Sequence, residues 1–252
     1  MNLSSGQDKL LAARVADAVH SAQNRHQTKF IGFLGEHDAA AAADIVRSLH
    51  YTAYRFFGGY EGAARVFLGV FSAYDEQLDQ SFPISPITVV FRKADTLTHR
   101  DFLGALLALG LTRDSVGDIL ISEGAAVVFA TEPCALLAAS ELTKVGSVGV
   151  EVMHGITVPI EVKREFDTIE GSVASFRLDC MVALVTRLSR ERSSALITSG
   201  LVGINGRQTD NISYKVSTGD SFSVRGYGKF LFTEVNALTR KGKQRVTVQK
   251  YK

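Results

Sequence analysis

The segment from Ser175 to Gly206 holds the residue types best suited to binding an anion. Its sequence, SFRLDCMVALVTRLSRERSSALITSGLVGING, predicts two short helices joined by Thr186-Arg187-Leu188 and followed by a strand and a tight turn. Ser189 is placed to cap the second helix, which leaves the first-turn amides and Arg190 facing outward. A helix N-terminus with guanidinium groups beside it attracts phosphate oxygens. The segment therefore predicts a rigid, basic, phosphate-binding edge.

Such an edge can read the phosphate spacing and the splayed loops of structured RNA. Asp179 lies on the first helix, where we expect it to support an arginine such as Arg190. Two alternatives stay open: Arg190 and Arg192 could be exposed helix charges with no partner, and Asn205-Gly206 could be only a hairpin turn. The candidate RNA-binding residues are Arg177, Ser189, Arg190, Arg192, Ser193, Asn205, Arg207, Arg225 and Lys229.

The charge of the chain is divided unevenly between its two ends. The net charge is only +2, but residues 172–252 contain fourteen Lys and Arg against five Asp and Glu, which makes +9. The first 171 residues contain fourteen basic and twenty-one acidic residues, which makes −7. This asymmetry indicates a polyanion partner for the C-terminal end, although a solvated basic surface would give the same count. The acidic part could instead bind a protein partner.

Two further motifs contain residue types that could carry chemistry. The first is His99-Arg100-Asp101, which places a base, a cation and an acid next to one another at the start of a helix. Neither a nucleophile nor a second carboxylate accompanies them, so a structural or RNA-docking role is favoured. The run GGYEG could cradle a phosphate, but it lacks the Lys-Ser/Thr ending of a nucleotide-binding loop and is interpreted as a tight turn. The histidines and cysteines show no ligand spacing, so neither a metal nor a cofactor is predicted.

Composition is that of an ordinary globular protein, with 252 residues, 46% of them hydrophobic and 21% charged. The N-terminus lacks the apolar run of a signal peptide. The longest apolar stretch, residues 102–111, is far shorter than the roughly 20 residues of a membrane span. Cys134 and Cys180 are expected to be buried free thiols, as in a reducing compartment. We therefore expect a cytoplasmic protein that does not enter a membrane.

Three parts of an α+β protein are predicted to position these residues. The first, residues 1–80, is a small α/β region with helical spacing from Leu11 to Ala22 and again from Glu36 to about His50. Two strands are predicted after it, at 52–57 and 65–71, joined by the glycine-rich run.

The central part, residues 84–155, alternates strands and helices in the order β-α-β-β-α-β, as in a ferredoxin-like, RNA-recognition-like domain. Many domains with this fold bind no nucleic acid, so the fold alone decides nothing about function. Its predicted strands are 86–93, 118–122, 125–130 and 148–153, and its predicted helices are 99–110, capped by Thr98, and 133–140.

A connector is expected around residues 156–171, because charges alternate there without a clear period. The third part, residues 172–252, begins with the two short helices and continues as a basic, strand-rich tail with turns at Gly226-Tyr227-Gly228 and Lys241-Gly242.

The spacing R-L-D, then L-S-R, then L-I-x-x-G-x-V-x-I-N-G resembles the alpha-L RNA-binding domain over residues 173–232. That module also occurs in a small-subunit ribosomal protein, in tyrosyl-tRNA synthetases and in pseudouridine synthases. The runs FFGGYEGA, LTHRDFLGALLALGL and VGDIL, with the tail TRKGKQRVTVQKYK, are similar to the YlmH family. This likeness extends over most of the chain from about residue 10.

The resemblance implies a non-catalytic protein that binds structured RNA, rRNA or tRNA, on the ribosomal large subunit. It also implies a possible part in the rescue of obstructed large subunits that carry peptidyl-tRNA. One alternative is an RNA-modifying enzyme of the pseudouridine-synthase type, although the first 171 residues contain no catalytic-aspartate motif of that family. The other alternative is a protein-interaction adaptor that uses the acidic N-terminal parts.

Overall fold

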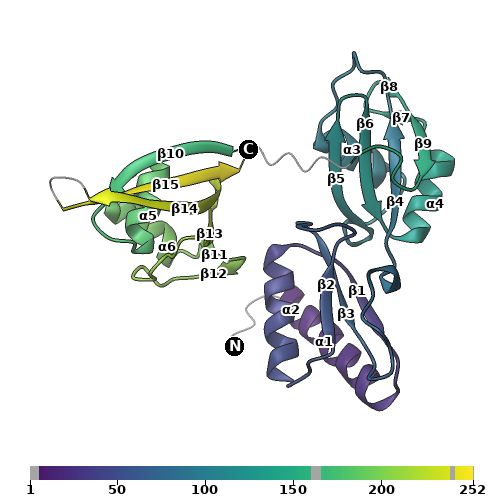
Figure 1. The fold of residues 1–252 in the computed structure, drawn as a ribbon, viewed down its shortest axis with the longest axis horizontal. Helices are drawn as coiled ribbons and strands as arrows, with labels where there is room; N and C mark the ends of the chain where they lie inside the picture. The colour runs from purple at the N-terminus through teal and green to yellow at the C-terminus, as the bar shows by residue number, and fades with distance from the viewer. Residues whose placement is uncertain (1–5, 160–165, 239–241, 252) are drawn as a thin grey trace. The chain divides into compact units, whose positions relative to one another are not determined.

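The computed structural model describes residues 6–159, 166–238 and 242–251 (Figure 1). The chain divides into two compact units, Met1–Val162 and Lys163–Lys252. Helices and sheets occur in both units, which confirms the predicted α+β class. The first unit contains both of the parts predicted at 1–80 and 84–155.

The first unit begins with two helices that pack on one face of a three-stranded antiparallel sheet of order β1-β3-β2. Val15 and Val19 of the first helix are buried against Ile31 and Leu68 of the sheet, so the apolar spacing of the helix creates this layer. The first strand was not predicted. The elements are α1 (Gly6–Asn24), β1 (Lys29–Leu34), α2 (Glu36–Ser48), β2 (Tyr54–Phe57) and β3 (Val66–Val70).

A four-stranded antiparallel sheet of order β5-β6-β4-β9 follows, with the elements in the chain order β-α-β-β-α-β. Its strands and helices are β4 (Ser85–Val90), α3 (His99–Ala108), β5 (Val116–Ser122), β6 (Ala125–Ala130), α4 (Glu132–Glu141) and β9 (Glu151–His154). Two short 3-10 turns, Asp79–Ser81 and Arg113–Ser115, precede β4 and β5.

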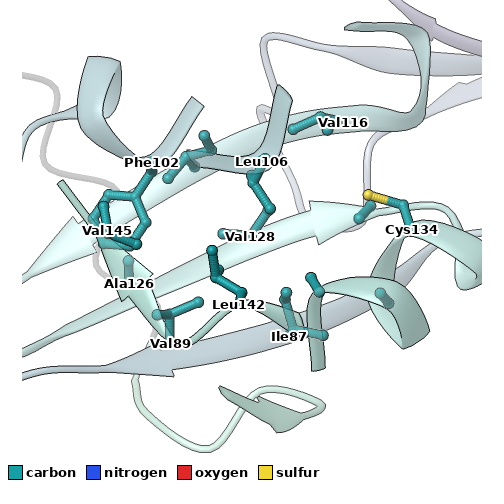
Figure 2. Packing of buried hydrophobic residues seen from close by; sticks show 14 of the residues in the cluster. Ile87, Val89, Phe102, Leu106, Val116, Ala126, Val128, Cys134, Leu142 and Val145 are labelled. Carbon is teal, nitrogen blue, oxygen red and sulfur yellow. The ribbon is translucent and has the colours of Figure 1, made fainter. Parts of the chain in front are cut away.

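Thr98 caps α3, as predicted, within a complete capping box. Its hydroxyl accepts from the Asp101 amide, while the Asp101 carboxylate accepts from the Thr98 amide at 2.8 Å. The helix then lays Phe102 and Leu106 onto Val128 and the neighbouring residues of the sheet (Figure 2).

The predicted strand 148–153 is wrong as a single element. Val148–Gly149 forms β8, which pairs only with β7 (Lys144–Val145) in a small hairpin, and β9 begins at Glu151. The single apolar run is broken because Val150 donates its amide to the Thr143 carbonyl instead of entering the larger sheet.

The two sheets of the first unit share an aromatic layer. Strand β6 alternates, so that Val128 faces the helices while Val127 and Phe129 face the opposite side. On that side they form one buried cluster with side chains from the three-stranded sheet and from the segment that follows it. These side chains are Phe33, Phe67, Phe71 and Phe82.

The second unit is a six-stranded antiparallel sheet of order β10-β15-β14-β13-β11-β12 with two short helices on one face (Figure 1). Its elements are β10 (Phe166–Val173), α5 (Leu178–Thr186), α6 (Arg190–Thr198), β11 (Val202–Ile204), β12 (Arg207–Gln208), β13 (Ser221–Val224), β14 (Gly228–Leu238) and β15 (Gln244–Tyr251). Met181, Val182 and Ile197 of the helices are buried against Phe230 and Phe232 of the sheet.

The connector predicted at 156–171 is wrong for its last residues. Residues 166–171 belong to β10, which pairs with β15 from Phe166↔Tyr251 to Val173↔Gln244, so the unit begins before the predicted start at 172. Gly171 lets Leu184 of α5 pack closely on this strand, because a Cβ there would lie 2.2 Å from the Leu184 Cδ1 and the leucine would have to move. The tail residues 239–241 and 252 lie outside the described residues, as does the predicted turn residue Lys241.

Candidate nucleic-acid interface

The two helices of the second unit lie where the sequence predicts them, except that Thr186, which was predicted in the connection, is the last residue of α5. Arg177 occupies the N-cap position of α5, and Arg187, with a φ of 59°, ends that helix in the left-handed region. Ser189 caps α6, since its hydroxyl accepts from the Arg192 amide at 3.3 Å. The connection between the helices is therefore a sharp turn with basic residues on both sides.

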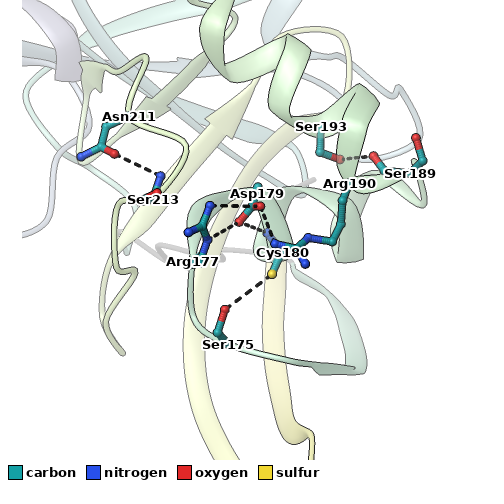
Figure 3. A network of polar contacts seen from close by, with 9 residues as sticks. All are labelled: Ser175, Arg177, Asp179, Cys180, Ser189, Arg190, Ser193, Asn211 and Ser213. Atoms are coloured by element: carbon teal, nitrogen blue, oxygen red, sulfur yellow. Dashed lines mark hydrogen bonds and ion pairs between the residues drawn. The ribbon is translucent and has the colours of Figure 1, made fainter.

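Asp179 is the centre of a charged cluster at this turn (Figure 3). Its carboxylate is buried, with the whole residue 3% exposed, and it accepts from Arg190 Nη2 at 2.8 Å and from Arg177 Nε at 3.1 Å. The Cys180 amide donates to the same carboxylate at 3.0 Å. The predicted support of Arg190 by Asp179 is thus present, and Asp179 supports Arg177 as well.

The cluster carries one negative and two positive charges, so its sum is positive. Burial by itself would raise the pKa of Asp179, but the hydrogen bonds and charges of Arg190 and Arg177 outweigh burial and lower it. In turn, the hydrogen bond to Asp179 raises the pKa of Arg190. Asp179 and Arg190 are therefore both ionised at neutral pH.

Both guanidinium groups are bonded to the buried carboxylate of Asp179, and both arginine side chains are still exposed to solvent. The side chains of Arg177 and Arg190 are 41% and 61% exposed, whereas that of Asp179 is 4% exposed. An arginine has five N–H donors in a planar fork, and the bonds to Asp179 use only some of them. The remaining donors are pre-oriented for an oxyanion such as a phosphate.

Lys215 joins this cluster, although sequence reasoning did not select it. Its backbone forms an antiparallel bridge with Arg177, and the flanking amides of Leu178 and Val216 close the pairing with Tyr214 and Phe176. Opposed residues of an antiparallel pair place their side chains on the same face, so the exposed Lys215 lies beside Arg177. Only its positive charge could have indicated it from the sequence.

Ser193 was predicted to bind RNA, and this is wrong. The residue is completely buried, and its hydroxyl donates to the Ser189 carbonyl one turn earlier at 3.0 Å. Arg192, by contrast, is exposed on the first turn of α6, and Ser189 is exposed at its cap.

Asn205 and Gly206 form a two-residue hairpin turn, with φ values of 48° and 77°. The side-chain Nδ2 of Asn205 donates to the Asp220 carboxylate at 2.8 Å, and its side-chain oxygen accepts from the backbone amide of Ser221 at 2.8 Å. The side chain therefore holds the turn against the next strand, and a contact between Asn205 and RNA stays a prediction.

Of the last three candidates, Lys229 does not share a face with the arginine cluster. Lys229 precedes the buried Phe230 in β14, so its side chain lies on the sheet face opposite the helices, where Nζ is 5.1 Å from the centre of the Tyr251 ring. Arg225 is exposed in the turn between β13 and β14, and Arg207 is exposed on β12 at the sheet edge.

Within the described ranges, no group of three or more His, Cys, Asp or Glu is arranged to hold a metal ion. No helix in that part of the chain is long and apolar enough to cross a membrane. Both cysteines are buried free thiols, as predicted, and burial raises the pKa of the Cys134 thiol.

Comparisons with known proteins agree on one family. Residues 79–157 match the family described as "Putative RNA-binding domain in YlmH". The chain is 34% identical over 203 residues to the ribosome-associated protein quality control protein P2 of Bacillus subtilis (strain 168), which covers 78% of this chain and 77% of that protein. The solved cell division protein ylmH from Streptococcus pneumoniae has a similar fold, with a TM-score of 0.54 and 17% identity over 62% of this chain and 95% of that chain.

The matched domain and the ribosome-associated relative place the chain in the RNA-binding class. The chain belongs to the YlmH family. The matched domain is the four-stranded part of the first unit, not the C-terminal unit that the charge pattern indicated.

Proposed function

We propose that the protein binds structured RNA, rRNA or tRNA, mainly through the arginine cluster of the C-terminal unit. The observation that carries this proposal is the pair Arg177 and Arg190, held by one buried carboxylate while both side chains stay exposed. Two oriented guanidinium groups in a segment, residues 172–252, with a net charge of +9 suit the closely spaced phosphates of folded RNA.

The partner that we propose is the ribosomal large subunit, in the rescue of obstructed subunits that carry peptidyl-tRNA. The name of the Bacillus subtilis relative, which refers to ribosome-associated quality control, supports a ribosomal partner. This action requires no covalent chemistry, and its place would be the cytoplasm.

We also propose the finer architecture, with a ferredoxin-like domain at 84–155 and an alpha-L RNA-binding domain within 172–252, preceded by the α/β region 1–80. The strand order β5-β6-β4-β9 supports the first assignment, and the helix pair α5 and α6 followed by the β11–β12 hairpin supports the second.

The central domain would contribute less to RNA affinity than the C-terminal unit. Residues 79–157 contain five Lys and Arg against nine Asp and Glu, a net charge of −4 that repels phosphate. RNA-recognition domains stack bases on an open sheet face, but here Phe33 and Phe67 cover Val127 and Phe129 on that face. A contact with RNA would therefore use other surfaces of this domain.

Co-sedimentation of the full chain with purified large subunits, empty or loaded with peptidyl-tRNA, tests the proposal. The double variant Arg192→Ala, Lys215→Ala removes two exposed cations beside the cluster and should reduce binding by roughly tenfold. The double variant Arg14→Ala, Arg47→Ala is the matched control, because both are exposed helix arginines of the first unit. Equal binding of the two variants would remove the cluster from the proposal.

Two other functions predict different results. An RNA-modifying enzyme would change the nucleosides of its RNA with turnover, which nucleoside mass spectrometry detects. An adaptor would keep its partner after nuclease treatment and at high salt, because its contacts would not depend on phosphates.

A further inference from the structure

A cavity of about 510 Å³ opens beside the glycine-rich loop between β2 and β3 in the first unit. Backbone of the loop, residues 58–63, forms one side of it. The residues that line it include three aromatic and three charged ones: Phe56, Phe57, Tyr60, Arg55, Glu61 and Asp79. Phe57 and Tyr60 pack on the aromatic cluster between the two sheets, whereas Phe56 packs toward the helices. Charged and aromatic residues thus both line this hollow.

The loop is fixed by a buried carboxylate from another sheet. Asp118 of β5 is 9% exposed and accepts from the Tyr60 hydroxyl at 2.7 Å, the Ala64 amide at 2.6 Å and the Arg65 amide at 3.1 Å. A Cβ at Gly58 would lie 2.3 Å from the Arg65 carbonyl, so the loop closes only with glycine there.

The far end of the loop is anchored as firmly. The Arg65 guanidinium donates to the Phe33 carbonyl at 2.7 Å and to the Val116 carbonyl at 3.0 Å, which ties the loop to both sheets. A surface turn needs none of these bonds merely to reverse the chain. A loop held from two sides is typical of a preorganised binding site.

One guanidinium group, that of Arg55, already lies among the residues that line the cavity. The guanidinium of Arg55 lies 5.7 Å from the centre of the Phe57 ring and pairs with Asp79 at 2.5 Å. A cation between an aromatic face and a carboxylate is a stable arrangement. Glu61 is exposed on the loop, and the described residues provide no ion-pair partner for it. Tyr60, whose ring packs on Phe129, and Glu61 both line the cavity, so an aromatic residue and a carboxylate lie beside the space that a second cation would enter.

The surroundings have the charge that such a guest requires. The segment 74–80, which contacts Arg55 through the Gln77 carbonyl and contributes Asp79 to the cavity, contains three acids and no basic residue. The first 171 residues carry −7 in total. This field repels the phosphates of RNA and attracts a basic polypeptide.

We propose that the cavity binds an arginine side chain from a basic segment of a partner protein, with the guanidinium against Tyr60 and paired with Glu61. The site is separate from the arginine cluster of the C-terminal unit. Loss of binding here would leave RNA binding intact, so the two proposals fail independently.

The test uses the full chain and a fluorescent peptide, acetyl-Arg-Gly-Arg-Gly-amide, with a citrulline peptide of the same length as the neutral match. Glu61→Gln should weaken binding of the arginine peptide roughly fivefold, because a charge-assisted contact is lost. Glu123→Gln removes the same charge from an exposed turn outside the cavity and should leave affinity unchanged. Thermal melting checks that both variants stay folded.

The backbone amide NMR signals of Gly58, Gly59 and Gly62 show whether the peptide binds at the loop. We expect these signals to shift when the arginine peptide is added. Equal losses in the two glutamate variants would mean diffuse attraction to an acidic surface and would overturn the proposal. So would equal binding of the citrulline peptide. A short single-stranded RNA that moved the same glycine signals and displaced the peptide would make the cavity a nucleic-acid site, again contrary to the proposal.

Discussion

Arg190 and Asp179 are joined by a 2.8 Å ion pair between two different helices, and only the arginine is exposed to solvent. Arg190 is therefore more than a surface charge, because it compensates a buried carboxylate. The RNA-binding edge and the stability of the C-terminal unit depend on the same side chain.

Arg190→Glu should consequently destabilise the protein. The change places a second carboxylate beside Asp179, and we expect a measurable loss of stability, smaller than for a fully buried pair because Arg190 is exposed. Urea denaturation measures this loss. Arg47→Glu, which breaks a pair with the more exposed Asp44, should cost less than about 1 kcal/mol. Similar costs for the two variants would show that the buried partner is irrelevant.

Arg192→Glu should separate binding from stability. Arg192 is exposed on the first turn of α6, where a positive side chain can approach phosphate directly. We expect RNA affinity to fall roughly tenfold while stability changes by only about 0.5 kcal/mol. Filter binding and thermal melting on one sample give both values. Arg14→Glu, on an exposed position of α1, is the charge-matched control; if it lowered affinity as much, the effect would be one of net charge alone.

The stability of the C-terminal unit should depend on Asp179 at low pH. Arg190 and Arg177 hold the pKa of Asp179 below its ordinary value, against the opposing effect of burial. The carboxylate therefore stabilises the fold fully above its unfolded-state pKa of about 3.9, and this contribution is lost as the pH falls through the lower folded-state value. Denaturation at several pH values should show a weaker acid dependence for Asp179→Asn. Asp17→Asn, on the surface of α1, should behave as the unchanged protein does.

Binding of RNA should weaken steeply with salt. About five phosphate contacts give an expected log–log slope of roughly −3 to −5, because neutralised phosphates release counterions. A titration across salt concentrations measures the slope, and a value near zero would favour the adaptor function. The fragment 1–165, which ends just before β10, should bind RNA far more weakly in the same assay. Equal affinity of the fragment would move the main site to the first unit.

The sequence predicted those features that depend on neighbouring residues. Thr98 and Ser189 cap their helices because each precedes a helix whose amides it can satisfy. The pairing of Asp179 with Arg190 followed from two short helices with a three-residue connection. These relationships are local, so a pattern of residue types specifies them.

The features that were missed depend on distant parts of the chain. Strand β10 contains Asp167 and Glu170 and resembles a polar connector, and only β15, at the other end of the unit, makes it a strand. Lys215 lies beside Arg177 for a similar reason, through a bridge formed in the folded unit. Ser193 was misassigned because the sequence does not distinguish a serine near a helix start that faces solvent from one that faces the core.

The aromatic layer between the two sheets of the first unit makes their folding interdependent. Phe129 is fully buried by side chains that come from far earlier in the chain, such as Phe33. A polypeptide that began at residue 84 would expose Val127 and Phe129 as an apolar patch and would tend to aggregate. Residues 1–162 should therefore unfold in one cooperative transition, and any affinity of the segment 79–157 for RNA must be measured with the helices that precede it still attached.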